Sequence, residues 1–146
     1  MAEDFNLYLA TDRERILSCF SVMKELRPHL TDAEAFGDQI ERQRASGYRL
    51  EYADYDGEVV GVVGYRTLEN TLYGRFVYVD DLVVTSTMRG IQFGAALLEA
   101  ARIFARDSNC AHFVLDTGLH MTDAQKFYNR NGLVAHGMHF VERLKT

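Results

Sequence analysis

Two adjacent carboxylates, Asp80 and Asp81, interrupt the otherwise apolar stretch from Phe76 to Val84. Adjacent acids inside an apolar strand are costly to bury, which favours a functional role for at least one of them. A carboxylate here can act as a general base, directly or through water, on an amine substrate. An alkylammonium has a pKa of about 10 and must lose a proton before its nitrogen can act as a nucleophile. The alternative is a strand-end pair of solvated or capping carboxylates. Neighbours in a regular strand point to opposite faces, so only one faces a given site unless the strand bulges.

A basic, glycine-bearing turn follows this strand and leads into a long amphipathic helix. The start of a helix leaves several backbone N–H groups without intrahelical partners, at the positive end of the helix dipole. Gly90 and Gly94 let the backbone approach a bulky anion, and Arg89 adds a formal positive charge. The turn therefore predicts a phosphate cradle, although its spacing is neither G-x-G-x-x-G nor G-x-x-x-x-G-K-[ST].

Two motifs in this chain resemble the GNAT N-acetyltransferases. Leu82-Val83-Val84, four intervening residues and Arg89-Gly90-x-x-x-Gly94-Ala95 resemble the acetyl-CoA-binding motif of that family. Farther along, Ala124 to Leu133 resembles the A-x-x-[FL]-Y-x-x-x-G-[FL] stretch of the family. Two motifs in the same order are more specific than either alone, and the resemblance covers nearly the whole chain. One departure is Gln92, which stands where the family usually has its middle glycine and whose Cβ narrows the cradle.

The resemblance implies acetyl-CoA as co-substrate and assigns roles to particular residues. Asp80 or Asp81 is the base, since this strand is similar to the E-D-I-x-V strand of diamine and polyamine acetyltransferases. The strand is expected to splay from the next one, His112 to Asp116, and to expose main-chain groups to the pantetheine arm. The residues expected to bind the cofactor are Leu82, Val83, Val84, Arg89, Gly90, Ile91, Gln92, Phe93, Gly94 and Ala95.

The resemblance also implies that the hydroxyl of Tyr128 points at the cofactor sulfur. A phenol with a pKa of about 10 can protonate a leaving thiolate without being ionised at neutral pH. The alternative is a core aromatic, and of the adjacent pair we favour Phe127 as core and Tyr128 as acid. Arg27-Pro28-His29 lies where the acceptor-side loop of the family falls, although arginines at helix ends are usually solvated.

The apolar periodicity predicts an α/β fold with a central mixed sheet in three layers, flanked by helices on both faces, in a single domain 1–146. Thr11, Thr31 and Thr122 each begin a capping-box pattern, and Asn131-Gly132 is typical of a helix stop. The expected strands are Phe5 to Ala10, one beginning at Tyr48, Val59 to Tyr65, Phe76 to Val84, His112 to Asp116 and Met138 to Leu144. The expected helices are Ile16 to Leu26, one from Ala33 that ends at Gly47, one beginning at Phe93 and one that contains Phe127.

Composition limits the classes of partner. The 146 residues carry a net charge of −5, which argues against nucleic acid as the main partner. With no leader and no apolar run near the ~18 residues of a membrane span, we predict a cytoplasmic protein that does not contact membranes. Cys19 and Cys110 have no metal or redox spacing and are interpreted as buried thiols, and the five histidines complete no metal-ligand pattern, so no metal is expected.

The leading hypothesis is acetyl-CoA-dependent N-acetylation of a primary amine by direct transfer in a ternary complex, because no cysteine is placed for a covalent acetyl intermediate. The acceptor is left open between a polyamine, an amino acid, an aminoglycoside-like amine and a peptide amine, with a slight tilt toward a small cation. A non-catalytic acyl-CoA-binding or sensor module is the alternative, and a nucleotide-binding protein ranks third. A homodimer is an expectation from the resemblance alone.

Overall fold

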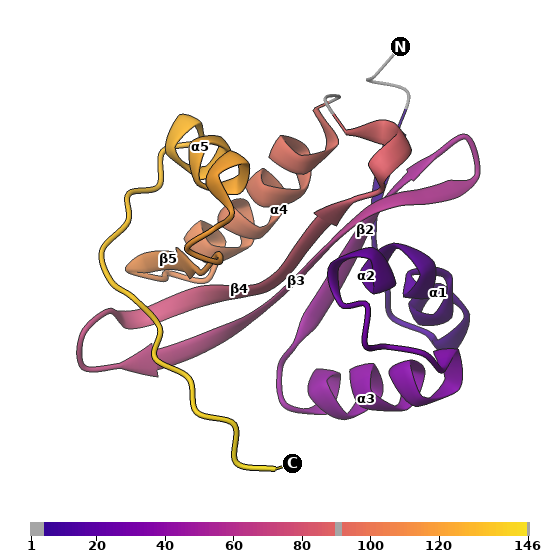
Figure 1. The fold of residues 1–146 in the computed structure, drawn as a ribbon, viewed down its shortest axis with the longest axis horizontal. Helices are drawn as coiled ribbons and strands as arrows, with labels where there is room; N and C mark the ends of the chain where they lie inside the picture. The colour runs from indigo at the N-terminus through magenta and orange to yellow at the C-terminus, as the bar shows by residue number, and fades with distance from the viewer. Residues whose placement is uncertain (1–4, 90–91, 146) are drawn as a thin grey trace. The chain divides into compact units, whose positions relative to one another are not determined.

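The computed structural model describes residues 5–89 and 92–145 and divides into two compact units, Met1–Leu115 and Asp116–Thr146. The interpretation of the chain as one domain stays a prediction. The first unit contains β1 (Phe5–Leu9), α1 (Arg13–Ser18), α2 (Phe20–Leu26), α3 (Ala33–Ala45), β2 (Arg49–Tyr55), β3 (Glu58–Asn70), β4 (Gly74–Val84), the 3-10 helix η1 (Ser86–Met88), α4 (Phe93–Asp107) and β5 (His112–Leu115), and the second contains α5 (Thr122–Arg130) (Figure 1).

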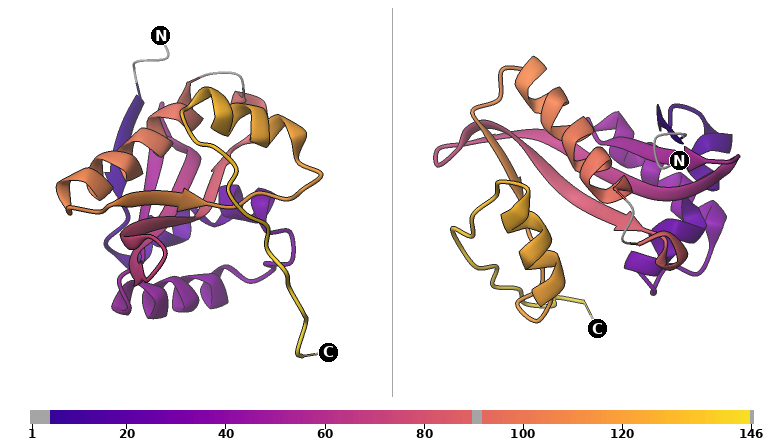
Figure 2. Two further views of the ribbon diagram at one scale, coloured as in Figure 1. Left: turned by 90° about the vertical axis from the view of Figure 1, so that its left-hand side faces the viewer. Right: turned by 90° about the horizontal axis from the view of Figure 1, so that it is seen from above.

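A five-stranded mixed sheet forms the centre of the first unit, in the order β1-β2-β3-β4-β5. The first three pairings are antiparallel and β4 pairs with β5 in parallel. Helices α1 to α3 lie on one face and α4 lies on the other, as the end-on view in Figure 2 shows. The predicted α/β class, with helices on both faces of a mixed sheet, is confirmed.

Each face of the sheet has its own apolar core because successive strand residues point to opposite sides. Val62 packs with Ile16 and Ile40 under α1 to α3, whereas Val63 packs with Leu97 under α4. The continuous apolar run in the sequence of β3 follows from this arrangement, since both faces of that strand are covered.

The predicted helix from Ile16 to Leu26 is two helices, which meet at Cys19. The backbone of Cys19 ends α1, with its N–H bonded to the carbonyl of Ile16, and its own carbonyl begins α2 by accepting from Met23. The apolar spacing continues through the break, so periodicity alone does not reveal it. Cys19 is fully buried as expected, but Cys110 is partly exposed, so the expectation that both thiols are buried is wrong for Cys110.

None of the three predicted threonines caps its helix. Asp12, not Thr11, caps α1 by accepting from the N–H of Arg15, and Asp32, not Thr31, caps α3. A carboxylate satisfies the same orphan N–H groups and also interacts favourably with the helix dipole. Thr122 is the first residue of α5 and makes no cap, since Met121 is the N-cap residue there without a side-chain hydrogen bond.

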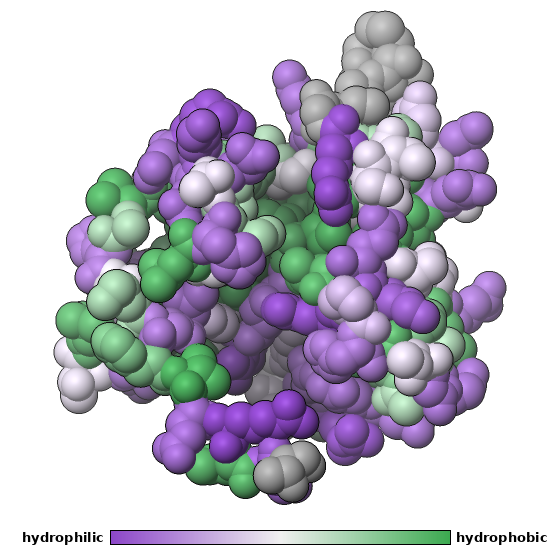
Figure 3. Space-filling model, viewed as in Figure 1, coloured by the Kyte–Doolittle hydropathy of each residue, from purple (hydrophilic) through white to green (hydrophobic). Residues whose placement is uncertain are grey.

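The second unit lacks the strand predicted from Met138 to Leu144, and this prediction is wrong. Residues 133–145 have no regular secondary structure, and the apolar side chains of this segment are exposed (green in Figure 3), Phe140 by 89% and Val141 by 86%. Alternating apolar residues suit a strand, but a strand also needs a pairing partner, and this segment pairs with no other strand in the described residues. The stop at Asn131-Gly132 is confirmed by a φ of 91° at Gly132.

Within residues 5–89 and 92–145, no helix is long and apolar enough to span a membrane.

Candidate active site

A β-bulge in β4 brings the two predicted carboxylates to the same face of the sheet. Gly64 of β3 lies opposite Asp81 and the next residue, Tyr65, lies opposite Val79, so Asp80 is the extra residue of the bulge. Both side chains then point toward the face covered by α1 to α3, where Asp81 reaches Arg27 and Asp80 reaches Arg66. The bulge that the sequence reasoning allowed for is therefore present, and neither aspartate is turned to the opposite face.

Asp81 has hydrogen-bond partners on both of its carboxylate oxygens. Its Oδ1 accepts from Nε and Nη2 of Arg27, at 3.2 and 3.1 Å, and its Oδ2 accepts from the Tyr48 hydroxyl at 2.7 Å. The side chain of Asp81 is only 13% exposed. Burial, and then the negative charge of Asp81, raise the pKa of Tyr48 well above its ordinary value, so the hydroxyl remains a donor. This arrangement fixes the carboxylate of Asp81 in one orientation.

Gly64 makes room for this arrangement. A Cβ at Gly64 would overlap the hydroxyl and the ring of Tyr48, which lies over the backbone directly opposite Asp81. A glycine inside a strand often marks such a close approach. Sequence reasoning placed Gly64 only within an apolar run and placed Tyr48 only in a strand pattern, so it missed both residues.

Asp80 has a different environment. Arg66 binds its carboxylate with both ends of the guanidinium, Nε to Oδ2 at 2.9 Å and Nη2 to Oδ1 at 3.0 Å. Burial is nevertheless the larger effect and raises the pKa of Asp80 above its ordinary value, against the opposing effect of Arg66. Arg66 also lies over the ring of Tyr78, 5.6 Å from its centroid. Arg66 was not singled out from the sequence, and its position two residues from Gly64 gives no local signal of its partner.

Arg27 is not a solvated helix-end arginine. Besides the two bonds to Asp81, its Nη2 donates to the backbone carbonyl of Asp80 at 2.7 Å. One side chain from the end of α2 therefore binds both residues of the bulge, which supports the prediction that this part of the chain lies beside the site.

The edge of β4 facing β5 is paired over only part of its length. β5 pairs with Phe76 to Val79, and in the part of the chain that the structure describes no strand covers that edge from Asp80 to Val84. Leu82 and Val84 are half-buried and Val83 is buried. The expected opening between the two strands therefore corresponds to an end of pairing, and beyond Val79 this edge of β4 has no strand partner within the described residues, which suits a ligand that adds like a strand.

Part of the predicted cradle lies beyond β4, and Gly90 and Ile91 lie outside the described residues. Arg89 is exposed, and its Nε donates to the carbonyl of Val84 at 3.1 Å while its guanidinium lies 4.0 Å from Glu25. Glu25 also accepts from the Thr85 hydroxyl and from the N–H of Ser86. The segment leading from β4 to the turn is thereby anchored on α2.

The other part of the cradle is the first turn of α4. Gln92 is the N-cap residue and is exposed, and its side chain makes no capping hydrogen bond. Phe93 is fully buried against the rings of Phe5 and Tyr55, so it can offer only its backbone to a ligand. Gly94 and Ala95 are half-buried. A helix start without a side-chain cap fits the diphosphate of a coenzyme, because its N–H groups remain available to an anion.

Tyr128 lies in α5 of the second unit, half-buried, with its ring 5.4 Å from that of Phe127 in an edge-on contact. Burial raises the pKa of Tyr128, so its hydroxyl is protonated at neutral pH. Phe127 is also half-buried, so the pair is not divided into one core ring and one exposed ring.

The histidines do not converge on a metal site in the structure as described. Over residues 5–89 and 92–145 no three His, Cys, Asp or Glu side chains gather closely enough to hold a metal ion. His139 pairs with Asp116 at 2.6 Å, and His120 is exposed.

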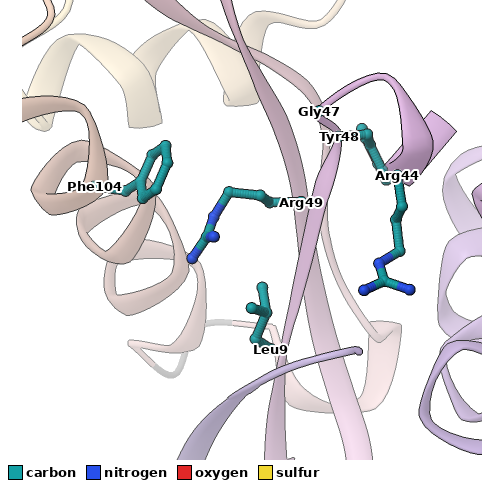
Figure 4. Close-up of a pocket in the computed structure, with 6 residues that line it drawn as sticks. All are labelled: Leu9, Arg44, Gly47, Tyr48, Arg49 and Phe104. Atoms are coloured by element: carbon teal, nitrogen blue, oxygen red, sulfur yellow. The ribbon is translucent and has the colours of Figure 1, made fainter. Parts of the chain in front are cut away.

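A hollow of about 360 Å³ lies elsewhere, beside the start of β2. Figure 4 shows Arg49 extending toward Phe104 while Arg44 lies on the other side of the β2 ribbon, so the two cations do not converge. Arg49 lies 4.1 Å from the Phe104 ring centroid and donates to Tyr65, which gives it a structural role. Neither aspartate and none of the cradle residues that the structure describes lines this hollow.

Comparison with known proteins identifies the class of protein to which this chain belongs. Residues 13–133 match the acetyltransferase (GNAT) family, and the chain belongs to this family. It is 27% identical over 119 residues to an uncharacterized N-acetyltransferase, YhdJ, of Bacillus subtilis strain 168, covering 81% of this chain and 83% of the relative. It is 29% identical over 131 residues to the aminoalkylphosphonate N-acetyltransferase of Salmonella typhimurium strain LT2, covering 87% of this chain and 84% of the relative.

Among solved structures, the aminoglycoside N-acetyltransferase AAC(6')-Iy in complex with CoA has a similar fold, with a TM-score of 0.84 at 16% identity, covering 97% of this chain and 95% of that one. The protein is therefore an acyltransferase with the GNAT fold, and the resemblance drawn from the sequence is confirmed.

Proposed function

We propose that the protein transfers the acetyl group of acetyl-CoA directly to the primary amine of a small molecule. The observation that carries this proposal is the bulge in β4, which sets Asp80 and Asp81 on one face beside an edge of the strand that has lost its pairing with β5. A base next to an open strand edge is the arrangement that the reaction requires, because the amine must be deprotonated where the thioester is bound.

Asp80 is the better candidate for the base. Both aspartates have hydrogen bonds on both oxygens, Asp81 from Arg27 and Tyr48 and Asp80 from Arg66, so these bonds do not choose between them. The pKa of Asp80 is raised by burial, so its carboxylate binds a proton more readily than an ordinary aspartate does. In this proposal Asp80 takes the proton from the acceptor ammonium, directly or through water, and Asp81 holds the bulge in place.

Tyr128 is the proposed acid. Its raised pKa keeps the hydroxyl protonated at neutral pH, so it can donate that proton to the leaving sulfur as the C–S bond breaks. The assignment rests on the family motif that contains Tyr128. Direct transfer is further supported by Cys19, whose thiol has a pKa raised to about 12 by burial and cannot serve as a nucleophile.

Acetyl-CoA, when bound, supplies an acetyl group activated as a thioester. The backbone from Leu82 to Val84 would hold the pantetheine arm, and the turn from Arg89 through Ala95, including Gly90, Ile91, Gln92, Phe93 and Gly94, would hold the diphosphate. The uncapped first turn of α4 supports this assignment.

The acceptor class is supported by one relative and by local charge. The Salmonella relative is named for aminoalkylphosphonates, which carry an amine and an anionic group in one small molecule. In this chain two arginines lie at the two aspartates, which suits such a molecule better than a polyamine or a peptide lysine. A cytoplasmic location, a homodimer and the absence of nucleic-acid, membrane and metal partners stay predictions from the sequence.

Release of free thiol from acetyl-CoA, followed with a panel of amines, tests the proposal. Amine-dependent release that falls by a factor of about a hundred or more in Asp80→Ala and in Tyr128→Phe supports it, since general acid–base catalysis contributes about 10²–10⁴-fold. Asp123→Ala, an exposed acid at the start of α5, is the control variant. Saturable acetyl-CoA binding with no release in any amine would instead favour the alternative, a non-catalytic acyl-CoA-binding module.

A further inference from the structure

Two guanidinium groups from distant parts of the chain meet at Asp80. Arg66 of β3 binds its carboxylate, and Arg27, which follows α2, donates to its backbone carbonyl at 2.7 Å. The positive and negative ends of this cluster are exposed to different extents. Both arginine side chains are 43% exposed, whereas the side chains of Asp80 and Asp81 are 23% and 13% exposed. The surface of the cluster is therefore mainly cationic, although its formal charges cancel.

Each of these two arginines has N–H donors that do not contact the aspartates. A guanidinium carries five N–H groups, and the bonds to the aspartates use only Nε and Nη2 of Arg27 and of Arg66. Within the described part of the chain, no hydrogen-bond partner is found for Nη1 of either residue. An additional anion can therefore be bound through Nη1 without breaking either ion pair, because neither ion pair uses that nitrogen.

We propose that Arg27 and Arg66 determine acceptor specificity by binding the anionic group of a zwitterionic amine through Nη1, while Asp80 faces its ammonium. This inference rests on the proposed function, since it assigns the second half of the same acceptor. Arginine suits a phosphonate or carboxylate because its planar donors match two oxygens of one group. A polyamine lacks such a group and brings additional cations to a cationic surface, so it would be a poor acceptor.

Matched acceptors separate the contribution of the anion from that of the amine. We compare kcat/KM for 2-aminoethylphosphonate, for β-alanine and for ethylamine. The wild-type protein is expected to prefer an anionic acceptor over ethylamine at least tenfold. Comparable preference for the phosphonate and the carboxylate would indicate recognition of negative charge, and a larger preference for the phosphonate would indicate recognition of its additional oxygen and charge.

The decisive quantity is the ratio of kcat/KM between the anionic acceptor and ethylamine in arginine variants. Charge-assisted bonds contribute enough that Arg66→Gln and Arg27→Gln should each lower this ratio about tenfold to a hundredfold, mainly through KM for the anionic acceptor. General damage to the fold or to the base affects both acceptors and cancels in the ratio. Arg66→Lys, which keeps the charge and loses the fork, should lower the ratio less, and it replaces Arg66→Gln if that variant does not fold.

Arg42→Gln, an exposed arginine of α3 outside the cluster, is the matched control and should leave the ratio unchanged. A wild-type ratio near one, or a ratio that both glutamine variants leave unaltered, overturns the inference. If no amine releases thiol, the proposed function fails separately, and calorimetric titration of 2-aminoethylphosphonate then decides the inference. Saturable binding that weakens in Arg66→Gln supports the arginine site, and absence of binding ends it.

Discussion

The two halves of β4 are built in different ways. From Phe76 to Val79 the strand pairs on both edges, with β3 and with β5, and Phe76, Val77 and Val79 are buried. From Asp80 to Val84 its only strand partner among the described residues is β3, and this half contains a bulge and carries two acids. The first half gains stability from apolar packing and complete pairing. The second half gives up one edge and places charges in the sheet, and each of those charges needs its own partner.

This contrast explains why the candidate site lies where it does. An open strand edge and a pair of partly buried acids destabilise a fold unless specific bonds compensate for them. The compensation comes from Arg27, Tyr48 and Arg66, side chains of other elements, whereas the paired half depends on nonspecific apolar contact. Substitutions in the two halves should therefore differ in magnitude, in coupling and in pH dependence.

The largest change in the free energy of unfolding is expected in the apolar core that covers the fully paired half of β4. Leu97 of α4 is fully buried and belongs to the same cluster as Val77 and Val79. Leu97→Ala should lower the free energy of unfolding by about 2–5 kcal/mol, because it leaves a cavity in a close-packed core. Urea unfolding followed by circular dichroism measures this loss. Ile103→Ala, which alters an exposed residue of the same helix, is the control, and an equal loss in both variants would contradict the assignment of the core.

Tyr48→Phe should cause the next largest loss in the free energy of unfolding. The substitution removes the donor to Oδ2 of Asp81 and leaves a partly buried carboxylate oxygen without that bond, at a cost of about 1.5–3 kcal/mol for a hydrogen bond to a charged group. Equilibrium unfolding in urea at neutral pH measures the change. Tyr8→Phe, on the partly exposed strand β1, should change stability by less than about 0.5 kcal/mol. A Tyr48 variant as stable as wild type would show that the bond contributes nothing to the bulge.

Gly64→Ala should destabilise by about 1–3 kcal/mol, as is typical of overpacking, because the new Cβ overlaps Tyr48. The same change at Gly137, where a Cβ would meet no atom within 4 Å, is the control. The double variant with Tyr48→Phe should be less destabilised than the sum of the two single variants, since both disturb one contact. Strict additivity in the urea-unfolding energies would mean that Gly64 and Tyr48 act independently.

The smallest effect is a difference in pH dependence. The pKa of Asp80 is raised in the folded state from an ordinary value of 3.8, so the folded protein binds more protons than the unfolded chain between that value and the raised one. Stability contributed by this residue should therefore fall as pH rises through that window and be constant below it. In Asp80→Asn this decline should be absent. Unfolding energies measured at a series of pH values test the sign, and a steeper decline in the variant would refute it.

Much of the fold was predictable because its signals are local. Alternation with a period of two residues identified the strand beginning at Tyr48, and apolar residues with a period of 3.6 identified the helix from Phe93. The prediction that the last helix ends at Gly132 was also correct. The same locality produced the errors. Thr31 and Asp32 are both good cap residues, and only the chain direction entering α3 decides between them. An alternating segment from Met138 to Leu144 has strand character but, in the described structure, pairs with no other strand.

The sequence by itself determined the family, the motif that carries the cofactor prediction, and the two acids that interrupt an apolar strand. Tertiary structure alone decided that Asp80 is the extra residue of a bulge, that both acids share a face, and that Arg27, Tyr48 and Arg66 are their partners. The physical reason is that a bulge is a property of register between two strands. Register depends on contacts between residues far apart in the chain, and no pattern within β4 records them.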